Sequence, residues 1–220
     1  MTVLLVLFTL ILFIATDSMV QRVRRARVAR ALEPIKVGNP NQIPQGVAFA
    51  LNHTWMREEK KGVTTIGIDG FLSSLAGAVE SVLLPPVEAR VVLTTPSIAL
   101  RHKGRELHLT LPIQGAILEV NDAVMKNPAL ASSDPYGRGW LVRVRPFDRP
   151  GPKVTTMVGE DAIRWLREQT DRAKDFLVAR LPQPLLLQDG GLPVEGLLKE
   201  FSPEVWKEFQ ATFVTNHIEQ

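Results

Sequence analysis

Few side chains of this 220-residue chain have the types and spacing that catalysis or metal binding requires. The histidines have no second histidine or carboxylate in a convincing metal-ligand motif; they are His53, His102, His108 and His217. Ser73 and Ser74 lack the glycine-flanked turn and the base that activate a serine nucleophile, and no nucleotide-binding glycine pattern is present. We therefore expect no catalytic residue and no metal site, with one alternative, in which His102 and His108 face each other across a hairpin.

The composition is that of a folded protein and excludes several classes. Hydrophobic residues make up 45% of the chain and charged residues 22%, which excludes a disordered chain and a coiled-coil rod. The chain has no cysteine, which excludes disulfides and thiolate-held metal centres. Five of its 26 lysines and arginines lie between residues 22 and 30, and this tract accounts for the net charge of +3. The rest of the chain is nearly balanced in charge, so we expect no nucleic-acid interface.

The N-terminal residues predict a membrane anchor over residues 1–31. Residues 3–15 are apolar apart from Thr9, and the basic residues follow this run rather than precede it. A cleaved signal peptide has the opposite order, so the pattern favours an uncleaved, single-pass transmembrane helix. The positive-inside rule then places the following domain on the cytoplasmic side of the cell (inner) membrane. The basic residues would set this topology and contact lipid headgroups; they are Arg22, Arg24, Arg25, Arg27 and Arg30.

The rest of the chain divides into a linker, a β-rich domain and an extension. Prolines and glycines mark residues 32–46 as the linker. Short apolar and β-branched runs between turn signals then predict a mainly β fold, a small sandwich or partly open barrel, and a helix trails this domain, which spans 47–181. Residues 182–220 form the extension, in which Ser202 and Pro203 begin a helix.

Two local patterns within the β-rich domain allow sharper predictions. Asp69 has the side chain of a helix cap, and Gly77 is the residue type that ends a helix, so we expect a short helix between them. Residues Arg101–Arg105 are polar and lie between the apolar runs Ile98–Leu100 and Leu107–Leu111. We therefore expect a hairpin of two strands joined by this polar turn.

Several segments of the domain follow one another in the order of a known family. They are His53-Thr-Trp55, Val63–Ile68, Ser81–Pro85, Pro112–Val124, Asn127–Leu130 and Ser133–Leu141. Together they resemble the H-protein of the glycine cleavage system. The resemblance implies a lipoyl-type β-sandwich (a barrel-sandwich hybrid), in which a hairpin lysine is amide-linked to lipoic acid. The lipoyl arm of the family carries an aminomethyl group between partner enzymes.

The position of that lysine decides what the resemblance implies. In the family it stands at a fixed distance from a preceding Leu-Pro and a following Pro-x-x-Gly. Counting forward from Pro85 and backward from Pro112 both reach Gly104, which has no side chain to acylate. Lys103 lies one residue earlier, and a shift of one residue in a strand turns a side chain toward the other face. The count implies a domain that has lost its arm, and Lys103 is the lipoyl attachment site only if the hairpin register changes.

These features lead to two functional hypotheses. The first is a non-catalytic, membrane-anchored accessory or scaffold subunit of a larger electron-transfer, respiratory or photosynthetic complex, without a cofactor. Its partners would be other subunits and the lipid bilayer. The alternative is a lipoyl carrier of glycine cleavage (glycine decarboxylation) or a related transfer pathway, with lipoate on Lys103. In the extension, an apolar helix stripe either packs in the core or docks a partner subunit; it consists of Val205, Trp206, Phe209 and Phe213.

Overall fold

The computed structural model describes residues 43–102, 104–147, 154–180, 196, 198 and 201–214. The predicted anchor and its arginines lie outside the described residues, as do Lys103 and His217; the arginines are Arg22, Arg24, Arg25, Arg27 and Arg30. Among the described residues, no helix has the length and apolar character needed to cross a membrane. The anchor, its topology and the lipid contact of the arginines therefore stay predictions.

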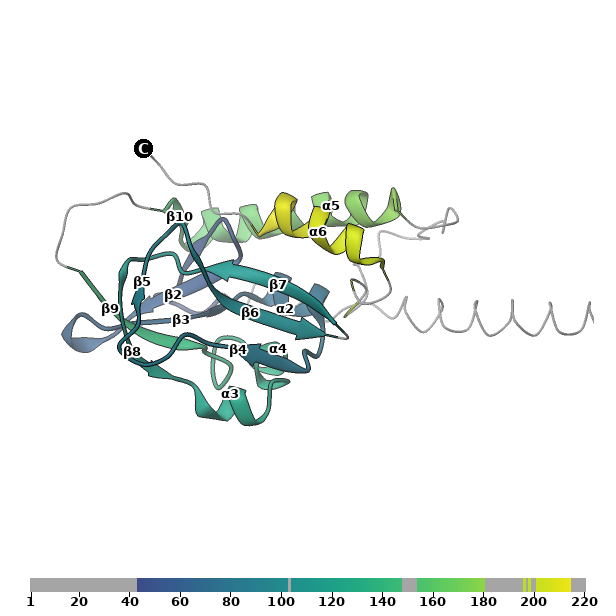
Figure 1. Ribbon diagram of the computed structural model, residues 1–220. Coiled ribbons are helices and arrows are strands. Elements are labelled where there is room, and N and C mark those ends of the chain that lie inside the picture. Colours follow the sequence, from purple (N-terminus) through teal and green to yellow (C-terminus); the bar gives the residue numbers. More distant parts are fainter. Residues whose placement is uncertain are drawn as a thin grey trace, which may run out of the picture.

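Two antiparallel β-sheets form the body of the molecule (Figure 1). The larger sheet has the strand order β10-β1-β2-β3-β9-β8-β5, and the smaller sheet has the order β4-β6-β7. The strands are β1 (Ala48–Ala50), β2 (Thr54–Glu58), β3 (Thr64–Ile68), β4 (Ser81–Leu83), β5 (Arg90–Val91), β6 (Pro96–His102), β7 (Arg105–Thr110), β8 (Gly115–Val120), β9 (Val142–Pro146) and β10 (Thr156–Met157). This architecture confirms the prediction of a mainly β fold, because short apolar runs between turns become the short strands of two antiparallel sheets.

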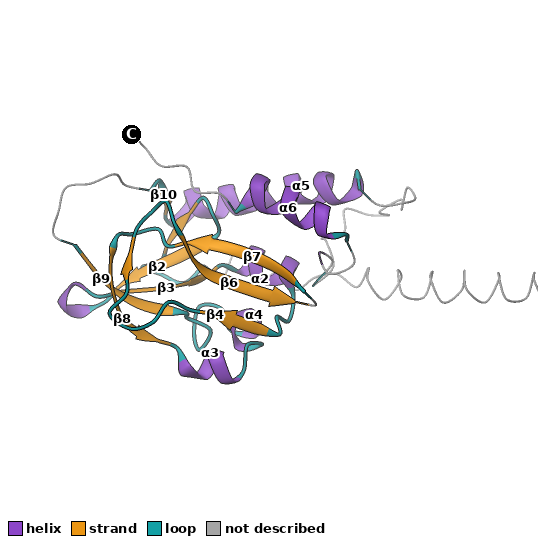
Figure 2. Ribbon diagram, in the orientation of Figure 1, coloured by secondary structure: helices purple, strands orange, loops and turns teal. Residues whose placement is uncertain are grey.

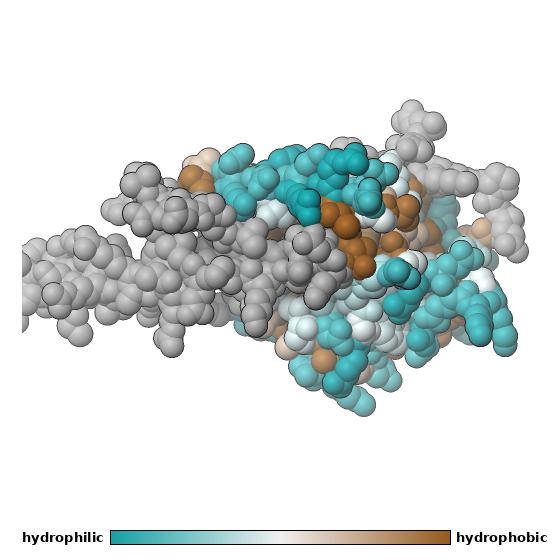
Figure 3. Space-filling view, turned by 180° about the vertical axis from the view of Figure 1, so that it is seen from behind, coloured by the Kyte–Doolittle hydropathy of each residue, from teal (hydrophilic) through white to brown (hydrophobic). Residues whose placement is uncertain are grey.

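Short helices connect the strands, and two longer helices follow them. They are η1 (Lys60–Gly62), α2 (Gly70–Ala76), α3 (Asp122–Lys126), α4 (Leu130–Ser133), α5 (Gly159–Val178) and α6 (Pro203–Phe213). Helices α5 and α6 lie side by side along one side of the sheets (Figure 2). The rings of Phe176 and Phe209 join the two helices, with centroids 6.0 Å apart. Viewed from behind, hydrophilic residues cover the helix layer and hydrophobic residues gather beneath it (Figure 3). This is the distribution expected of amphipathic helices on a core.

Helix α2 begins and ends where the sequence predicts. The Asp69 side chain accepts a hydrogen bond from the Leu72 main-chain N–H at 2.8 Å, which satisfies a donor that the helix itself leaves open. Gly77 follows the helix with a φ of +64°, a backbone conformation that glycine adopts without steric strain. The capped helix is therefore confirmed, and it places Asp69 at the centre of the domain, where it is fully buried.

The β6–β7 hairpin runs further than the sequence predicts. The polar segment Arg101–Arg105 is predicted as a turn, but β6 continues to His102 and β7 begins at Arg105. Arg101 pairs with Glu106, and His102 pairs with Arg105. The prediction is wrong about the length of the turn because cross-strand partners stabilise polar residues within strands, which composition alone does not reveal.

The apolar stripe of α6 lies in the core. Trp206, Phe209 and Phe213 are 3%, 0% and 3% exposed, and Val205 packs against the same cluster. The Phe213 ring lies 6.0 Å from that of Phe71 in α2, which ties the C-terminal helix to the β domain. The three aromatic side chains thus pack in the core and present no open face to a partner, while Val205 is partly buried. Docking through this stripe stays a prediction, for which the side chains would have to leave the core.

The buried position of Phe209 predicts a large loss of stability on truncation. We expect Phe209→Ala to lower the free energy of unfolding by about 3–5 kcal/mol, since it leaves a cavity between α6, α5 and the sheet. Chemical denaturation followed by tryptophan fluorescence measures the change. Lys207→Ala on the exposed side of the same helix is the control and should shift stability by no more than about 0.5 kcal/mol. Equal losses in both variants would contradict the packing of α6.

Candidate functional site

The apex of the β6–β7 hairpin is the part of the molecule that the sequence singles out. The pairing of His102 with Arg105 leaves positions 103 and 104 as the connection between the strands. Gly104 has a φ of +74°, and no heavy atom outside its immediate neighbours lies within 4 Å of the point that its Cβ would occupy. The space around Gly104 is therefore open, and a positive φ at this position favours glycine over other residues.

The register of the hairpin changes the argument about Lys103. A one-residue shift reverses the direction of a side chain within a strand, where successive side chains alternate between faces. Positions 103 and 104 lie between the paired residues His102 and Arg105, and the register shift in this hairpin is at Pro96 and Ile98, far from the apex. The alternation of side chains along a strand therefore does not apply to positions 103 and 104. Lys103 lies one residue before the counted position but still belongs to the connection between the two strands.

The charged residues beside the apex have partners. Arg101 Nε lies 2.5 Å from Glu106 Oε1 on the facing strand. His102 is buried, and its Nδ1 lies 3.9 Å from Glu80 Oε1. The Arg105 guanidinium lies over the Trp206 ring, 6.0 Å from its centroid. Of the two arginines beside the apex, Arg101 is thus paired with a carboxylate, while Arg105 keeps its charge over an uncharged ring.

The possible histidine pair of the hairpin does not form. His102 lies opposite Arg105, and His108 lies opposite Ala99. The alternative in which these histidines face each other is therefore wrong, and the reason is that the strands extend closer to the apex than the sequence predicts. Within the described part of the chain, no three histidine or acidic side chains gather as metal ligands would. The described histidines thus give no geometric basis for a metal centre.

His53 and Asp69 form a fully buried pair. His53 Nδ1 and Asp69 Oδ2 are 2.8 Å apart, and both side chains are 0% exposed. The imidazole is stacked between Phe71 and Trp165, at centroid distances of 4.1 and 4.8 Å. Its Nε2 has no hydrogen-bond partner among the described residues. A ring without exposure cannot meet a substrate, so the geometry supports the packing role expected of His53.

Tyr136 lies near the buried His53–Asp69 pair, beside the first residue of α2. Its hydroxyl oxygen accepts a hydrogen bond from the Gly70 main-chain N–H at 2.9 Å. Burial raises the pKa of Tyr136 well above its ordinary value, and the Asp69 carboxylate adds to this effect, while the Gly70 bond opposes it. The phenol therefore stays protonated. Sequence reasoning does not single out Tyr136, because its partners stand more than sixty residues away in the chain.

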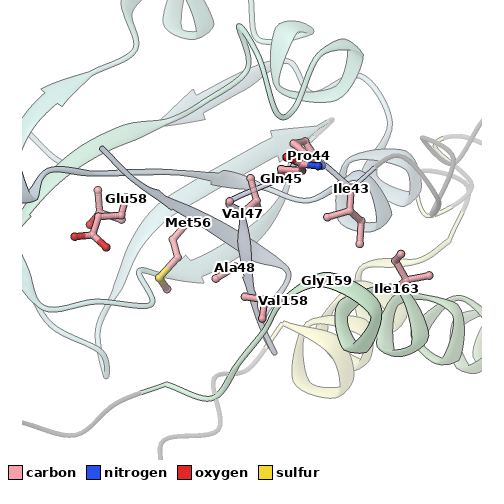
Figure 4. A pocket seen from close by; sticks show the side chains of 12 residues that line it. Ile43, Pro44, Gln45, Val47, Ala48, Met56, Glu58, Val158, Gly159 and Ile163 are labelled. Carbon is pink, nitrogen blue, oxygen red and sulfur yellow. The ribbon is translucent and has the colours of Figure 1, made fainter. Parts of the chain in front are cut away.

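A pocket of about 530 Å³ lies away from the hairpin, between β1, β2 and the start of α5 (Figure 4). Its lining is mostly apolar and includes Val47, Met56 and Ile163, with the exposed Glu58 at its rim. No side chain that the sequence analysis proposes for a site lines this pocket. The pocket and the hairpin apex are thus separate features of the surface.

The comparisons with known proteins decide the family. A family model described as glycine cleavage H-protein matches residues 47–169, which is more than half of the chain. The chain belongs to this family. A glycine cleavage system H protein of Neisseria gonorrhoeae is 33% identical over 106 residues, covering 48% of this chain and 80% of that protein. One from Shewanella sp. (strain MR-7) is 33% identical over 108 residues, covering 49% of this chain and 84% of that protein.

The H-protein family is also found among solved structures. The crystal structure of a glycine cleavage system H protein from Mycobacterium marinum has 26% sequence identity, with a TM-score of 0.49. It covers 56% of this chain and 98% of that protein. The match to the family model confirms the resemblance that the motifs of the β domain indicate, whereas helix α6 lies beyond the residues that this model matches.

H-proteins normally carry lipoate, so a carrier of this family needs a residue at the apex to which lipoate can be attached. An amide bond to lipoate needs a primary amine, and of the two apex positions only 103 supplies one. The amine of Lys103 therefore gives lipoate a point of attachment, whereas Gly104, the position that the ungapped count selects, has none.

The buried His53–Asp69 pair predicts a strong effect of a small substitution. Asp69→Ala removes the helix cap of Leu72 and leaves the His53 Nδ1 without its partner. We expect it to lower the free energy of unfolding by about 2–4 kcal/mol, the sum of a lost cap and a buried polar group left unsatisfied. Glu168→Ala on the exposed face of α5 is the control. Thermal unfolding compares the two, and an equal, small shift in both would show that the pair is unimportant for the fold.

Proposed function

We propose that this chain is a carrier protein of the glycine-cleavage type, serving glycine cleavage or a related transfer pathway, with lipoate attached to Lys103. The observation that carries the proposal is the hairpin register, because the pairing of His102 with Arg105 leaves Lys103 at the apex. Membership of the H-protein family supports this alternative over the scaffold hypothesis. Under this proposal the chain has lipoate as its cofactor, in place of the expectation that it has none.

Attachment would join Nζ of Lys103 to the carboxyl carbon of an activated lipoyl group. The activating group leaves, and the amine releases a proton to solvent. Once bound, lipoate supplies a dithiolane that can carry an aminomethyl group. The chain itself catalyses no bond change in this scheme, which agrees with the absence of a catalytic constellation in its sequence.

The residues of the hairpin would present the amine. The β6–β7 ladder holds the apex at the end of two paired strands, and β4 supports β6 from the other side through the pairing of Ser81 with Arg101. The ion pair of Arg101 with Glu106 joins the two strands of the hairpin beside the apex. Gly104 beside the lysine adds no side chain of its own at the apex.

Intact-protein mass spectrometry tests the proposal directly. Expressed in a host that lipoylates its own H-protein, the chain should gain the mass of one lipoyl group, and Lys103→Arg should abolish the gain. Lys61→Arg, in the exposed turn between β2 and β3, is the matched control and should leave the adduct intact. An unmodified mass for the wild-type chain, alongside a modified host H-protein, would exclude the carrier.

The scaffold hypothesis remains as the second candidate, since Gly104 occupies the position that the family count assigns to lysine. In it, the apolar residues 3–15 anchor the chain in a membrane and the β domain joins a larger complex. Affinity purification in mild detergent tests this hypothesis, which predicts that other membrane subunits co-purify in constant ratio. A chain recovered alone from every preparation, or recovered from the soluble fraction, would count against it.

A further inference from the structure

Helix α6 covers the open edge of the strand that leads away from the apex. β7 is the last strand of the smaller sheet, so one of its edges has no neighbouring strand among the residues that the structure describes. The main-chain N–H of His108 in β7 donates a hydrogen bond to Gln210 Oε1 in α6 at 2.9 Å. A side chain of the C-terminal helix therefore satisfies a donor that an edge strand otherwise offers to solvent or to a foreign strand.

A second point of contact lies directly beside the apex. Arg105 is the first residue of β7, and its guanidinium lies over the ring of Trp206, 6.0 Å from the centroid. Together, Trp206 and Gln210 of α6 with Arg105 and His108 of β7 form the α6–β7 contact. It touches β7 at its first residue and again three residues later, so it restricts both the position and the direction of the strand.

Helix α6 is itself held firmly to the body of the molecule. The indole N–H of Trp206 donates to the Leu198 carbonyl oxygen at 2.6 Å, and Trp206 is 3% exposed. Arg180, just after the end of α5, donates to Glu208 at 2.6 Å. The Phe209 and Phe213 rings stack at 4.9 Å within the core. The α6–β7 contact thus connects the hairpin to a fixed support rather than to a loose tail.

From these contacts we infer that α6 positions the hairpin apex, with Gln210 and Trp206 as positioning residues for modification at the apex; this rests on the proposed carrier function. Without the α6–β7 contact, β7 would be held on one side only, by β6, and its edge would open more often. The attaching enzyme would then meet the apex in its productive orientation for a smaller fraction of the time. This support lies outside the region matched by the family model, so it belongs to the C-terminal extension.

The test uses the full-length chain and the variant Gln210→Ala, which removes the hydrogen bond without emptying the core. Amide hydrogen exchange of His108, measured by NMR, should become about fivefold faster, as expected for the loss of about 1 kcal/mol of protection. Gln210→Glu retains an acceptor oxygen at the same reach and should restore slow exchange. Lys207→Ala, on the exposed side of α6, is the matched control and should leave the exchange unchanged.

The same proteins are then given to a lipoate ligase with lipoate and ATP, and the initial rate of modification is measured. We expect Gln210→Ala to lower kcat/KM for the chain severalfold, and Gln210→Glu to recover it. Unchanged His108 exchange in Gln210→Ala, or unchanged kcat/KM despite faster exchange, would overturn the inference while leaving the carrier function standing. A wild-type chain that the ligase does not modify would instead refute the carrier function and, with it, a role of α6 in modification.

Discussion

The pairing of β6 with β7 is the constraint on which the interpretation of this chain depends. The ladder runs in register from the pair Ile98 and Leu109 to the pair His102 and Arg105. Because strand side chains alternate between faces, this register fixes which hairpin residues enter the core and which meet solvent. It also fixes the apex as the two positions between the last paired residues. The location of the apex thus follows from backbone pairing and not from the polarity of the residues near it.

The surroundings of the apex follow from the same register. Pairing places Glu106 opposite Arg101, so the carboxylate and the guanidinium meet on the exposed side of the hairpin. It also places Arg105 at the start of the edge strand, within reach of Trp206. The four basic side chains in this five-residue segment therefore overstate the local charge, since Glu106 faces Arg101 once the strands are paired.

The sequence predicts those parts of the fold that depend on near neighbours. The helix between Asp69 and Gly77 is one example, because a cap and a terminating glycine act within a single turn. Contacts between distant segments are not predictable in this way. The acceptor for the His108 main-chain N–H is 102 residues away, and nothing in the local pattern around Gln210 indicates it. For the same reason the stripe of α6 is ambiguous in sequence, since a buried face and a docking face have the same period.

The glycine at the apex, which first suggests a lost arm, has a physical explanation that keeps the amine. Gly104 has a φ of +74°, a region that glycine enters freely and lysine enters with strain. In a tight two-residue connection, turn chemistry therefore favours glycine at this second position. The first position of the connection is Lys103, so the chain has an amine there. Gly104 thus accounts for the backbone at the second position, and Lys103 gives the chain an amine one residue before the position that the family count assigns to the lysine.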